Sequence, residues 1–264
     1  ERVLEYASEH GQDLVSAAVT PRFVPSCSSE LLTRLGDLAK RHGLVVQSHI
    51  SESQDEVAWV RKLHPEISSE SEHFASTGLL TATTVMAHGV YLTDADLDTL
   101  RTHGASVAHC PLSNFFFAGG VLDVRKLLDK GNKVCLGTDV AGGYSPSMLD
   151  AQRSAVVASR VASWTSGATP LDYRHAFYLA TRGGCLSLGL DHTVGTLDVG
   201  KYLDVLVVEP RRGAMDVTGT EPIDDLFEKW CNLGDDRCLV EVLVAGRHVA
   251  PLPRSRDAVQ PTGS

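Results

Sequence analysis

Val45-Val46-Gln47-Ser48-His49-Ile50-Ser51-Glu52 joins a short apolar run to a histidine and a glutamate. The run follows Gly43, and its length predicts a buried strand with His49 at the C-terminal end. Glu52 then falls where a following helix would begin, with Ser51 as a candidate cap. An imidazole and a carboxylate at the end of a strand can share hydrolytic work, because one holds a metal and the other moves protons. For this stretch alone, a core histidine beside a solvated glutamate is the more common alternative.

The same pattern recurs along the chain, because β-rich runs that end in polar residues alternate with helical segments. Strands are expected near residues 15–19, 45–49, 84–88, 105–109 and 133–138. Helices are expected near residues 1–13, 30–42, 51–63, 93–103, 120–130, 147–163 and 170–189, the last with Thr169 as cap and Pro170 in the first turn. Regular alternation predicts parallel strands joined by crossover helices. Functional residues at successive strand ends are typical of the mouth of a (β/α) barrel.

A doubly wound open sheet is the main alternative for an α/β chain of this kind. Such sheets commonly carry a glycine-rich phosphate loop after a strand. No G-x-G-x-x-G occurs in the sequence, and the stretch from Gly195 to Lys201, which fits G-x-x-x-x-G-K, is followed by Tyr202 instead of the Ser or Thr of a phosphate loop. The barrel interpretation is therefore preferred, with residues 1–193 as its extent. From about residue 194 short β segments predict a small β domain over 194–253, including a hairpin over 240–250. The polar tail, residues 254–264, is expected to be disordered.

Composition excludes several classes of protein. The chain has 264 residues, 43% of them hydrophobic, and a net charge of -9, which argues against a general nucleic-acid surface. No apolar stretch is long enough to span a bilayer, and no secretory signal opens the chain. The 6 cysteines form no C-x-x-C pair, and Cys110 and Cys135 lie in apolar runs. Buried free thiols in a reducing, cytoplasmic compartment are therefore expected.

Six residues at or just after four predicted strand ends are candidates for a catalytic site. A catalytic zinc takes a few nitrogen and oxygen ligands and lowers the pKa of its water to about 7, and a nearby carboxylate can move the proton. Each candidate also has a plainer explanation, such as a surface cation, a buried hydrogen-bonded histidine or a turn former. For His109 the plainer explanation is kept. The six candidates are Arg22, Phe23, His49, Glu52, His88 and Asp139.

Several motifs together resemble the amidohydrolase superfamily, and most closely its guanine deaminase family within the ATZ/TRZ-like purine and triazine deaminases. The resemblance extends from the first residues to about residue 252. The motifs are Thr20-Pro21-Arg22-Phe23, Gln47-Ser48-His49-Ile50-Ser51-Glu52, Ala87-His88-Gly89, His109-Cys110-Pro111-Leu112-Ser113-Asn114, Gly137-Thr138-Asp139 with the following Val140 to Ser145, and Asn232-Leu233-Gly234-Asp235-Asp236-Arg237.

The resemblance implies a role for each matching position. His49 and Asp139 would be ligands of one zinc ion per subunit, and Asp139 would also orient the attacking water. Glu52 would be the proton shuttle, and His88 would lie beside the reacting carbon. Together with His49 and Asp139, the pair Arg22-Phe23 would contact the substrate, because a guanidinium suits a purine carbonyl and a ring suits its π face. The implied reaction is guanine plus water giving xanthine plus ammonia, in a homodimer.

The sequence also departs from the family. Leu112 stands where the family usually has asparagine, and Phe115-Phe116-Phe117 is unusual, so we interpret the run as packing or a pocket wall. The family's first barrel strand carries a His-x-His pair, and none occurs here. Five predicted strands are also fewer than the eight of a closed barrel. We therefore expect the later part of a barrel plus part of the β domain, from a longer enzyme. The alternatives are an inactive truncated product that acts as a binding or dimerisation module, or a deaminase of another aminopurine or a triazine.

Overall fold

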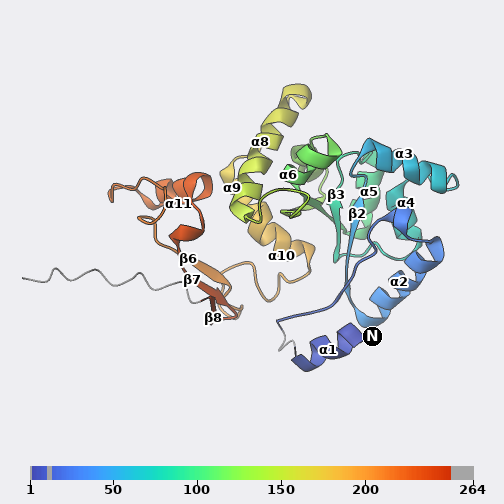
Figure 1. The fold of residues 1–264 in the computed structure, drawn as a ribbon, viewed down its shortest axis with the longest axis horizontal. Coiled ribbons are helices and arrows are strands. Elements are labelled where there is room, and N and C mark those ends of the chain that lie inside the picture. Colours follow the sequence, from blue (N-terminus) through green and yellow to red (C-terminus); the bar gives the residue numbers. More distant parts are fainter. Residues whose placement is uncertain (1, 11–13, 251–264) are drawn as a thin grey trace, which may run out of the picture. The chain divides into compact units, whose positions relative to one another are not determined.

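The chain divides into two compact units, Glu1–Leu190 and Asp191–Ser264, in a computed structural model that describes residues 2–10 and 14–250 (Figure 1). The tail at residues 254–264, which we expected to be disordered, lies outside the described residues.

Five parallel strands form the sheet of the first unit, and their order along the sheet is their order in the sequence. They are β1 (Ala18–Val19), β2 (Val45–Ile50), β3 (Thr84–His88), β4 (Ser106–His109) and β5 (Lys133–Leu136). His49 pairs with Ala87, Ala87 with Ala108, and Ala108 with Cys135. The C-terminal ends of these four strands therefore lie along the same edge of the sheet. The predicted α/β class and parallel strands are confirmed. Among the described strands the order never reverses, as it would at the switch point of a doubly wound sheet.

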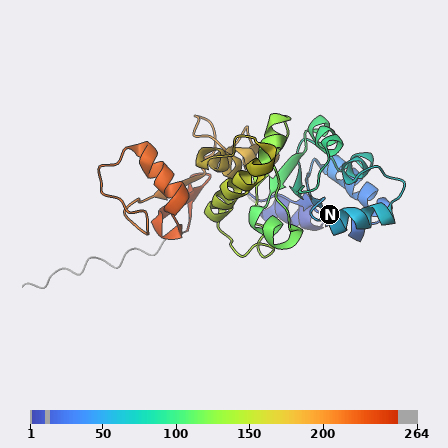
Figure 2. The ribbon, with the colours of Figure 1, turned by 90° about the horizontal axis from the view of Figure 1, so that it is seen from above.

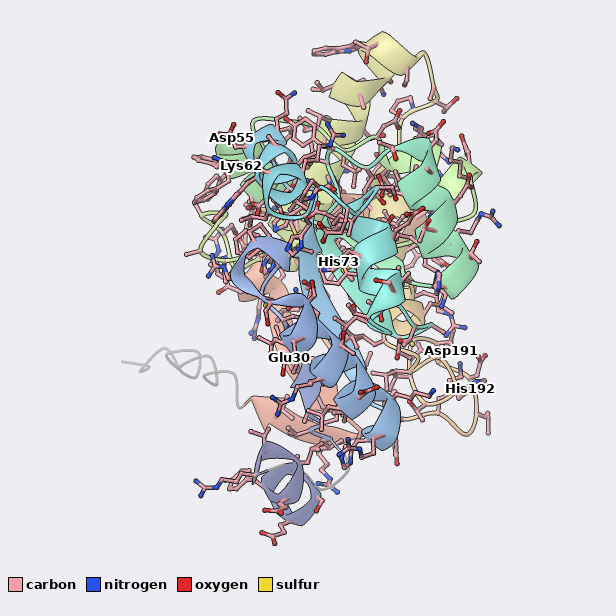
Figure 3. All side chains as sticks on the ribbon, turned by 90° about the vertical axis from the view of Figure 1, so that its right-hand side faces the viewer. Glu30, Asp55, Lys62, His73, Asp191 and His192 are labelled. Atoms are coloured by element: carbon pink, nitrogen blue, oxygen red, sulfur yellow. The ribbon has the colours of Figure 1, made fainter. Side chains whose placement is uncertain are left out.

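Helices connect the strands, and α2 to α5 lie on the same side of the sheet (Figures 1 and 2), as right-handed crossovers require. Helix α4 lies beside α2, where His73 Nε2 is 3.4 Å from Ser29 Oγ (Figure 3). The helical segments of this unit are α1 (Arg2–His10), η1 (Val24–Ser26), α2 (Ser29–His42), α3 (Gln54–Leu63), α4 (Glu70–Ser76), α5 (Asp94–His103), α6 (Pro111–Ser113), η2 (Asn114–Ala118), α7 (Val124–Asp129), α8 (Met148–Ser166), α9 (Tyr173–Tyr178), η3 (Leu179–Gly183) and α10 (Gly184–Ser187).

Three predicted helix starts are wrong. The helix expected from residue 120 begins at Val124, where Asp123 Oδ1 accepts from Lys126 N at 3.2 Å. Ser51 does not cap α3, because its backbone is left-handed with φ 46°, and Ser53 Oγ accepts the hydrogen bond of Glu56 N at 3.1 Å instead. The helix expected from Pro170 begins at Tyr173, because Leu171 N donates to Ser159 Oγ on α8 at 2.9 Å and the chain turns only at Asp172. Helix α4 was not predicted at all.

The core of this unit lies between the sheet and its helices. All five residues of β3 are buried, whereas β2 alternates between buried and half-buried positions. Leu32, Leu97 and Leu100 bring the helices onto the strands with almost no exposed surface. Burying such side chains contributes about 1.5–3 kcal/mol each, which fixes the strands that carry the site. All six cysteines are free thiols and Cys110 and Cys135 are buried, as predicted.

The second unit contains a three-stranded antiparallel sheet of β6 (Val205–Val208), β7 (Leu239–Val244) and β8 (Arg247–Ala250). Ala245 and Gly246 both have positive φ and form the two-residue turn between β7 and β8, so the predicted hairpin is confirmed. Helix α11 (Ile223–Leu233) and the short η4 (Asp236–Cys238) complete the described part of this unit. No helix among the described residues of the whole chain is long and apolar enough to cross a membrane.

Candidate active site

One cavity of about 290 Å³ brings all six candidate residues together at the C-terminal ends of the strands. Ser113, Phe117, Ala141 and Gly142 complete its lining. Phe117 belongs to the aromatic run that we interpreted as packing or a pocket wall, whereas Ser113, Ala141 and Gly142 lie in motifs of the resemblance but had no predicted role. The lining of the cavity is Arg22, Phe23, His49, Glu52, His88 and Asp139 together with those four.

Backbone strain is concentrated at this edge of the sheet. Ser51, His88 and Asp139 have φ values of 46°, 74° and 46°, a left-handed conformation that favours glycine. They follow or end β2, β3 and β5. Residues with this backbone conformation are often found at functional sites, where contacts with the surrounding structure stabilise it.

His49 is oriented by the backbone of Arg22. Its Nδ1 lies 2.6 Å from Arg22 O, and its backbone N donates to the same oxygen at 3.2 Å. Because Arg22 O can only accept, Nδ1 carries the proton and Nε2 keeps its lone pair. A backbone carbonyl on one ring nitrogen is a common arrangement behind a metal-binding histidine.

His88 is buried at the centre of the site. Its Nδ1 lies 3.0 Å from Asn114 Oδ1, so Nδ1 donates and Nε2 is the ring nitrogen directed toward the carboxylates. That Nε2 lies 3.7 Å from Glu52 Oε1 and 3.9 Å from Asp139 Oδ2. The ring stacks on His49 with centroids 5.3 Å apart. Asn114 ends the motif that begins at His109, but the sequence predicted no role for it.

His109 lies behind the site and does not line the cavity. Asn114 Nδ2 donates to its Nδ1 at 3.4 Å, which fixes the orientation of the amide that holds His88. Complete burial, with the nearby charge of His88 as a smaller cause, lowers the pKa of His109 to about 3. This histidine is therefore neutral at pH 7.

His49, His88 and Asp139 fit a metal ion. Each offers one ligand atom, and the three atoms all lie within 4.8 Å of one another. Two imidazole nitrogens and one carboxylate oxygen are a donor set that zinc accepts. Gly142 also lies against Asp139, since a Cβ at this position would be 2.4 Å from Asp139 Oδ2. Our sequence prediction named His49 and Asp139 as ligands, and the geometry adds His88 to the group.

Aromatic rings line one part of the cavity. The Arg22 guanidinium carbon lies 5.7 Å from the centre of the Phe23 ring, which meets Trp59 edge-on at 6.0 Å. Phe117 lines the same cavity while 69% of its surface is exposed, whereas Phe116 packs edge-on against Tyr144 at 5.7 Å. One member of the unusual aromatic run therefore faces the site.

Comparison with known proteins places this geometry in a family. The chain is 40% identical over 242 residues to guanine deaminase of Dictyostelium discoideum, a match that covers 90% of this chain and 54% of that protein. It is 41% identical over 268 residues to human guanine deaminase, where the match covers 97% of this chain and 58% of that protein. Among solved structures, guanine deaminase from C. acetobutylicum with bound guanine superposes with TM-score 0.86 at 32% identity (93% and 57%).

The chain spans about half the length of the curated relatives it matches. The family model described as the amidohydrolase family matches residues 1–249, which is nearly all of the sequence. The chain belongs to the amidohydrolase family.

Proposed function

We propose that the protein containing this chain hydrolyses guanine to xanthine and ammonia with one zinc ion per subunit. The observation that carries the proposal is the single cavity in which a cation, an aromatic ring and a carboxylate surround a His-His-Asp group. The relatives named above as guanine deaminases, one of them with guanine bound, support the choice of substrate.

His49, His88 and Asp139 would hold the zinc ion, which when bound supplies the Lewis acid that makes water a nucleophile at neutral pH. Arg22 O and Asn114 Oδ1 accept from the Nδ1 atoms of His49 and His88, and so direct the two Nε2 atoms toward the metal position.

Glu52 is the proposed proton shuttle. Its carboxylate is 28% exposed and lines the cavity, where Oε1 lies 3.7 Å from His88 Nε2. A carboxylate in this position can move one proton from the attacking water to a ring nitrogen of the purine, and then the second from the resulting hydroxyl group to the leaving amine. Asp139 would also orient the attacking water beside the reacting carbon.

Arg22 and Phe23 are the proposed contacts to the base. Arg22 presents planar N–H donors that suit the carbonyl oxygen of guanine, and Phe23 offers its ring to the purine π face. Because both residues line the cavity next to His49 and Glu52, a base held there would place its amino-bearing carbon near the catalytic groups.

The test is guanine loss, followed by ultraviolet absorbance, with the chain expressed together with all coding sequence that flanks it in its gene. Glu52→Gln should lower kcat by about 10²–10⁴-fold, because it removes the general base and keeps the shape. Glu66→Gln is the control, since Glu66 is exposed and outside the cavity. Unchanged turnover in Glu52→Gln would refute the assignment, and turnover of another aminopurine or a triazine in place of guanine would refute the substrate.

We also propose cytoplasmic residence and a homodimer. The six free cysteines support a reducing compartment, and the net charge of -9 supports a small-molecule substrate over nucleic acid. The dimer is supported only by the family resemblance. Sedimentation velocity at several protein concentrations tests it, and a concentration-independent monomer would contradict it.

A further inference from the structure

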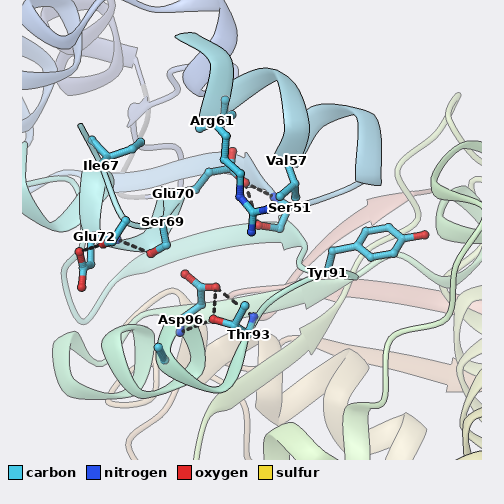
Figure 4. A pocket seen from close by; sticks show the side chains of 13 residues that line it. Ser51, Val57, Arg61, Ile67, Ser69, Glu70, Glu72, Tyr91, Thr93 and Asp96 are labelled. Carbon is cyan, nitrogen blue, oxygen red and sulfur yellow. Dashed lines mark hydrogen bonds between the residues drawn. The ribbon is translucent and has the colours of Figure 1, made fainter. Parts of the chain in front are cut away.

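The two residues directly after β2 each donate a backbone hydrogen bond to a buried carboxyl group. Ser51 N and Ser51 Oγ both donate to Glu70 Oε2, at 2.9 Å and 2.7 Å (Figure 4). Glu52 N donates to Glu56 Oε2 at 2.7 Å. The two acceptors come from different helices, Glu70 from α4 and Glu56 from α3.

These carboxyl groups are costly to bury. Glu56 is 6% exposed and Glu70 is 5% exposed, and the Oε1 atom of each has no hydrogen-bond partner among the described residues. Burial raises the pKa of both, and for Glu70 burial together with the charge of Glu56 raises it to about 8. Apolar side chains of similar size would fill the space at lower cost. A role other than packing is therefore needed to explain them.

The bonds fix a strained turn. Ser51 has φ 46°, which a serine adopts only when its surroundings impose it. Ser51 stands between His49 and Glu52, so its backbone angles decide where the Glu52 carboxylate points. Losing the acceptors would let the turn relax toward ordinary angles.

The acceptor on α4 is itself anchored. Ser71 Oγ, next to Glu70 on α4, donates to Asp96 Oδ1 at 2.5 Å, and Asp96 belongs to the capping box of α5 with Thr93 (Figure 4). Helix α4 is thereby tied to the element that follows β3. The turn after β2 is thus held by a chain of polar contacts outside the catalytic cavity.

We propose that Glu56 and Glu70 are positioning residues that hold the Ser51–Glu52 turn and thereby aim Glu52 into the active site. This inference rests on the proposed role of Glu52. Neither carboxyl lines the catalytic cavity; Glu70 lines a separate one of about 140 Å³ together with Ser51.

Paired variants separate hydrogen bonding from packing. In Glu70→Gln the amide oxygen can still accept both bonds from Ser51, whereas Glu70→Leu keeps the approximate size and accepts none. We expect Glu70→Gln to keep kcat within about threefold, and Glu70→Leu to lower it about 10- to 100-fold with little change in KM, because a displaced general base loses rate more than binding. Glu56→Gln and Glu56→Leu should differ in the same direction. Glu72→Leu is the control on α4, since the Glu72 carboxylate accepts from Ser68 Oγ just before the helix, and its backbone N, which the variant keeps, donates to the capping Ser69 Oγ.

Amide hydrogen exchange gives a readout that needs no activity. The Ser51 amide should exchange about 10-fold faster or more in Glu70→Leu and at the wild-type rate in Glu70→Gln. If guanine is not a substrate the kinetic comparison fails, but the exchange rates still decide whether the carboxyls hold the turn. Equal kcat in Glu70→Leu and wild type, or equal loss in Glu70→Gln and Glu70→Leu, would overturn the inference. Unchanged exchange in Glu70→Leu would also overturn it.

Discussion

Phe116 and Phe117 allow a sharp test of the substrate pocket. They are neighbours in η2 and have the same exposed fraction, 69%, but only Phe117 lines the catalytic cavity. Phe116 instead contacts Tyr144. We predict that Phe117→Ala weakens the binding of a planar base and that Phe116→Ala does not.

The magnitude follows from the geometry. Stacking a base on an aromatic ring contributes about 1–3 kcal/mol when measured by alanine substitution. Because the protein leaves most of Phe117 uncovered, the substrate would cover one open surface of the ring, and we take the lower part of this range. About 1.4 kcal/mol corresponds to a tenfold rise in KM. The contact exists in the ground state and the transition state alike, so kcat should stay within about twofold.

Initial rates over a range of guanine concentrations provide the assay, with thermal denaturation as a check on folding. Removing an exposed ring should change the free energy of unfolding by less than about 0.5 kcal/mol in either variant. Phe116→Ala should leave KM within about twofold of wild type. Equal KM values in the two variants would refute the reasoning, since they differ only in which ring faces the cavity.

Three further predictions concern stability and metal binding. Gly36→Ala should destabilise the chain by about 2 kcal/mol, because the new Cβ would lie 2.0 Å from the backbone oxygen of Thr77 and overpacking outweighs the gain in helix propensity. In Gly184→Ala, within α10, the new Cβ meets nothing within 4 Å, so this variant should be more stable by about 0.5–1 kcal/mol. Thermal denaturation of both variants is the test, and a stabilising Gly36→Ala would contradict the packing. The pKa of Glu70 is raised from 4.5 to about 8, so the folded state binds this proton more tightly than the unfolded state. The stability that this proton contributes is fully present below pH 4.5 or so and is lost as the pH rises through about 8. Urea titrations at several pH values should therefore show a free energy of unfolding that depends less on pH in Glu70→Gln than in the wild type. Asn114→Leu should weaken zinc binding about 10- to 100-fold in a chelator competition, because it removes the acceptor that orients the candidate ligand His88. Unchanged zinc affinity would show that the amide is dispensable.

The strands and the residues at their ends could be predicted because both signals are local. A run such as residues 84–88 is apolar and β-branched, and it ends in a histidine that sits at the edge of any parallel sheet. Since parallel strands present their C-terminal ends along one edge, a barrel places His49, His88 and Asp139 around one mouth, even though β4 separates β3 from β5. The grouping of these residues therefore required no knowledge of side-chain contacts.

The partners of these residues could not be predicted, because they lie far away in the sequence and carry no pattern. Glu70 is 19 residues from Ser51, and in the sequence it is one of several acids in a polar stretch for which no helix was predicted. Asn114 is 26 residues from His88, and its amide could equally have capped a turn. Periodicity describes which face of an element is buried, but it does not say which polar atom on that face meets another.

The three left-handed residues show how the chain balances backbone energy against chemistry. Glycine would occupy the positions of Ser51, His88 and Asp139 without the cost of about 1–2 kcal/mol that a side chain incurs in this conformation. Each position nevertheless carries a polar side chain that lines a cavity, and glycine would remove an imidazole, a carboxylate or the hydroxyl that binds Glu70. A turn needed only to connect β2 or β3 to the next helix would not require these atoms. The strain is consistent with a site in which the direction of each side chain matters more than the ease of the turn that carries it.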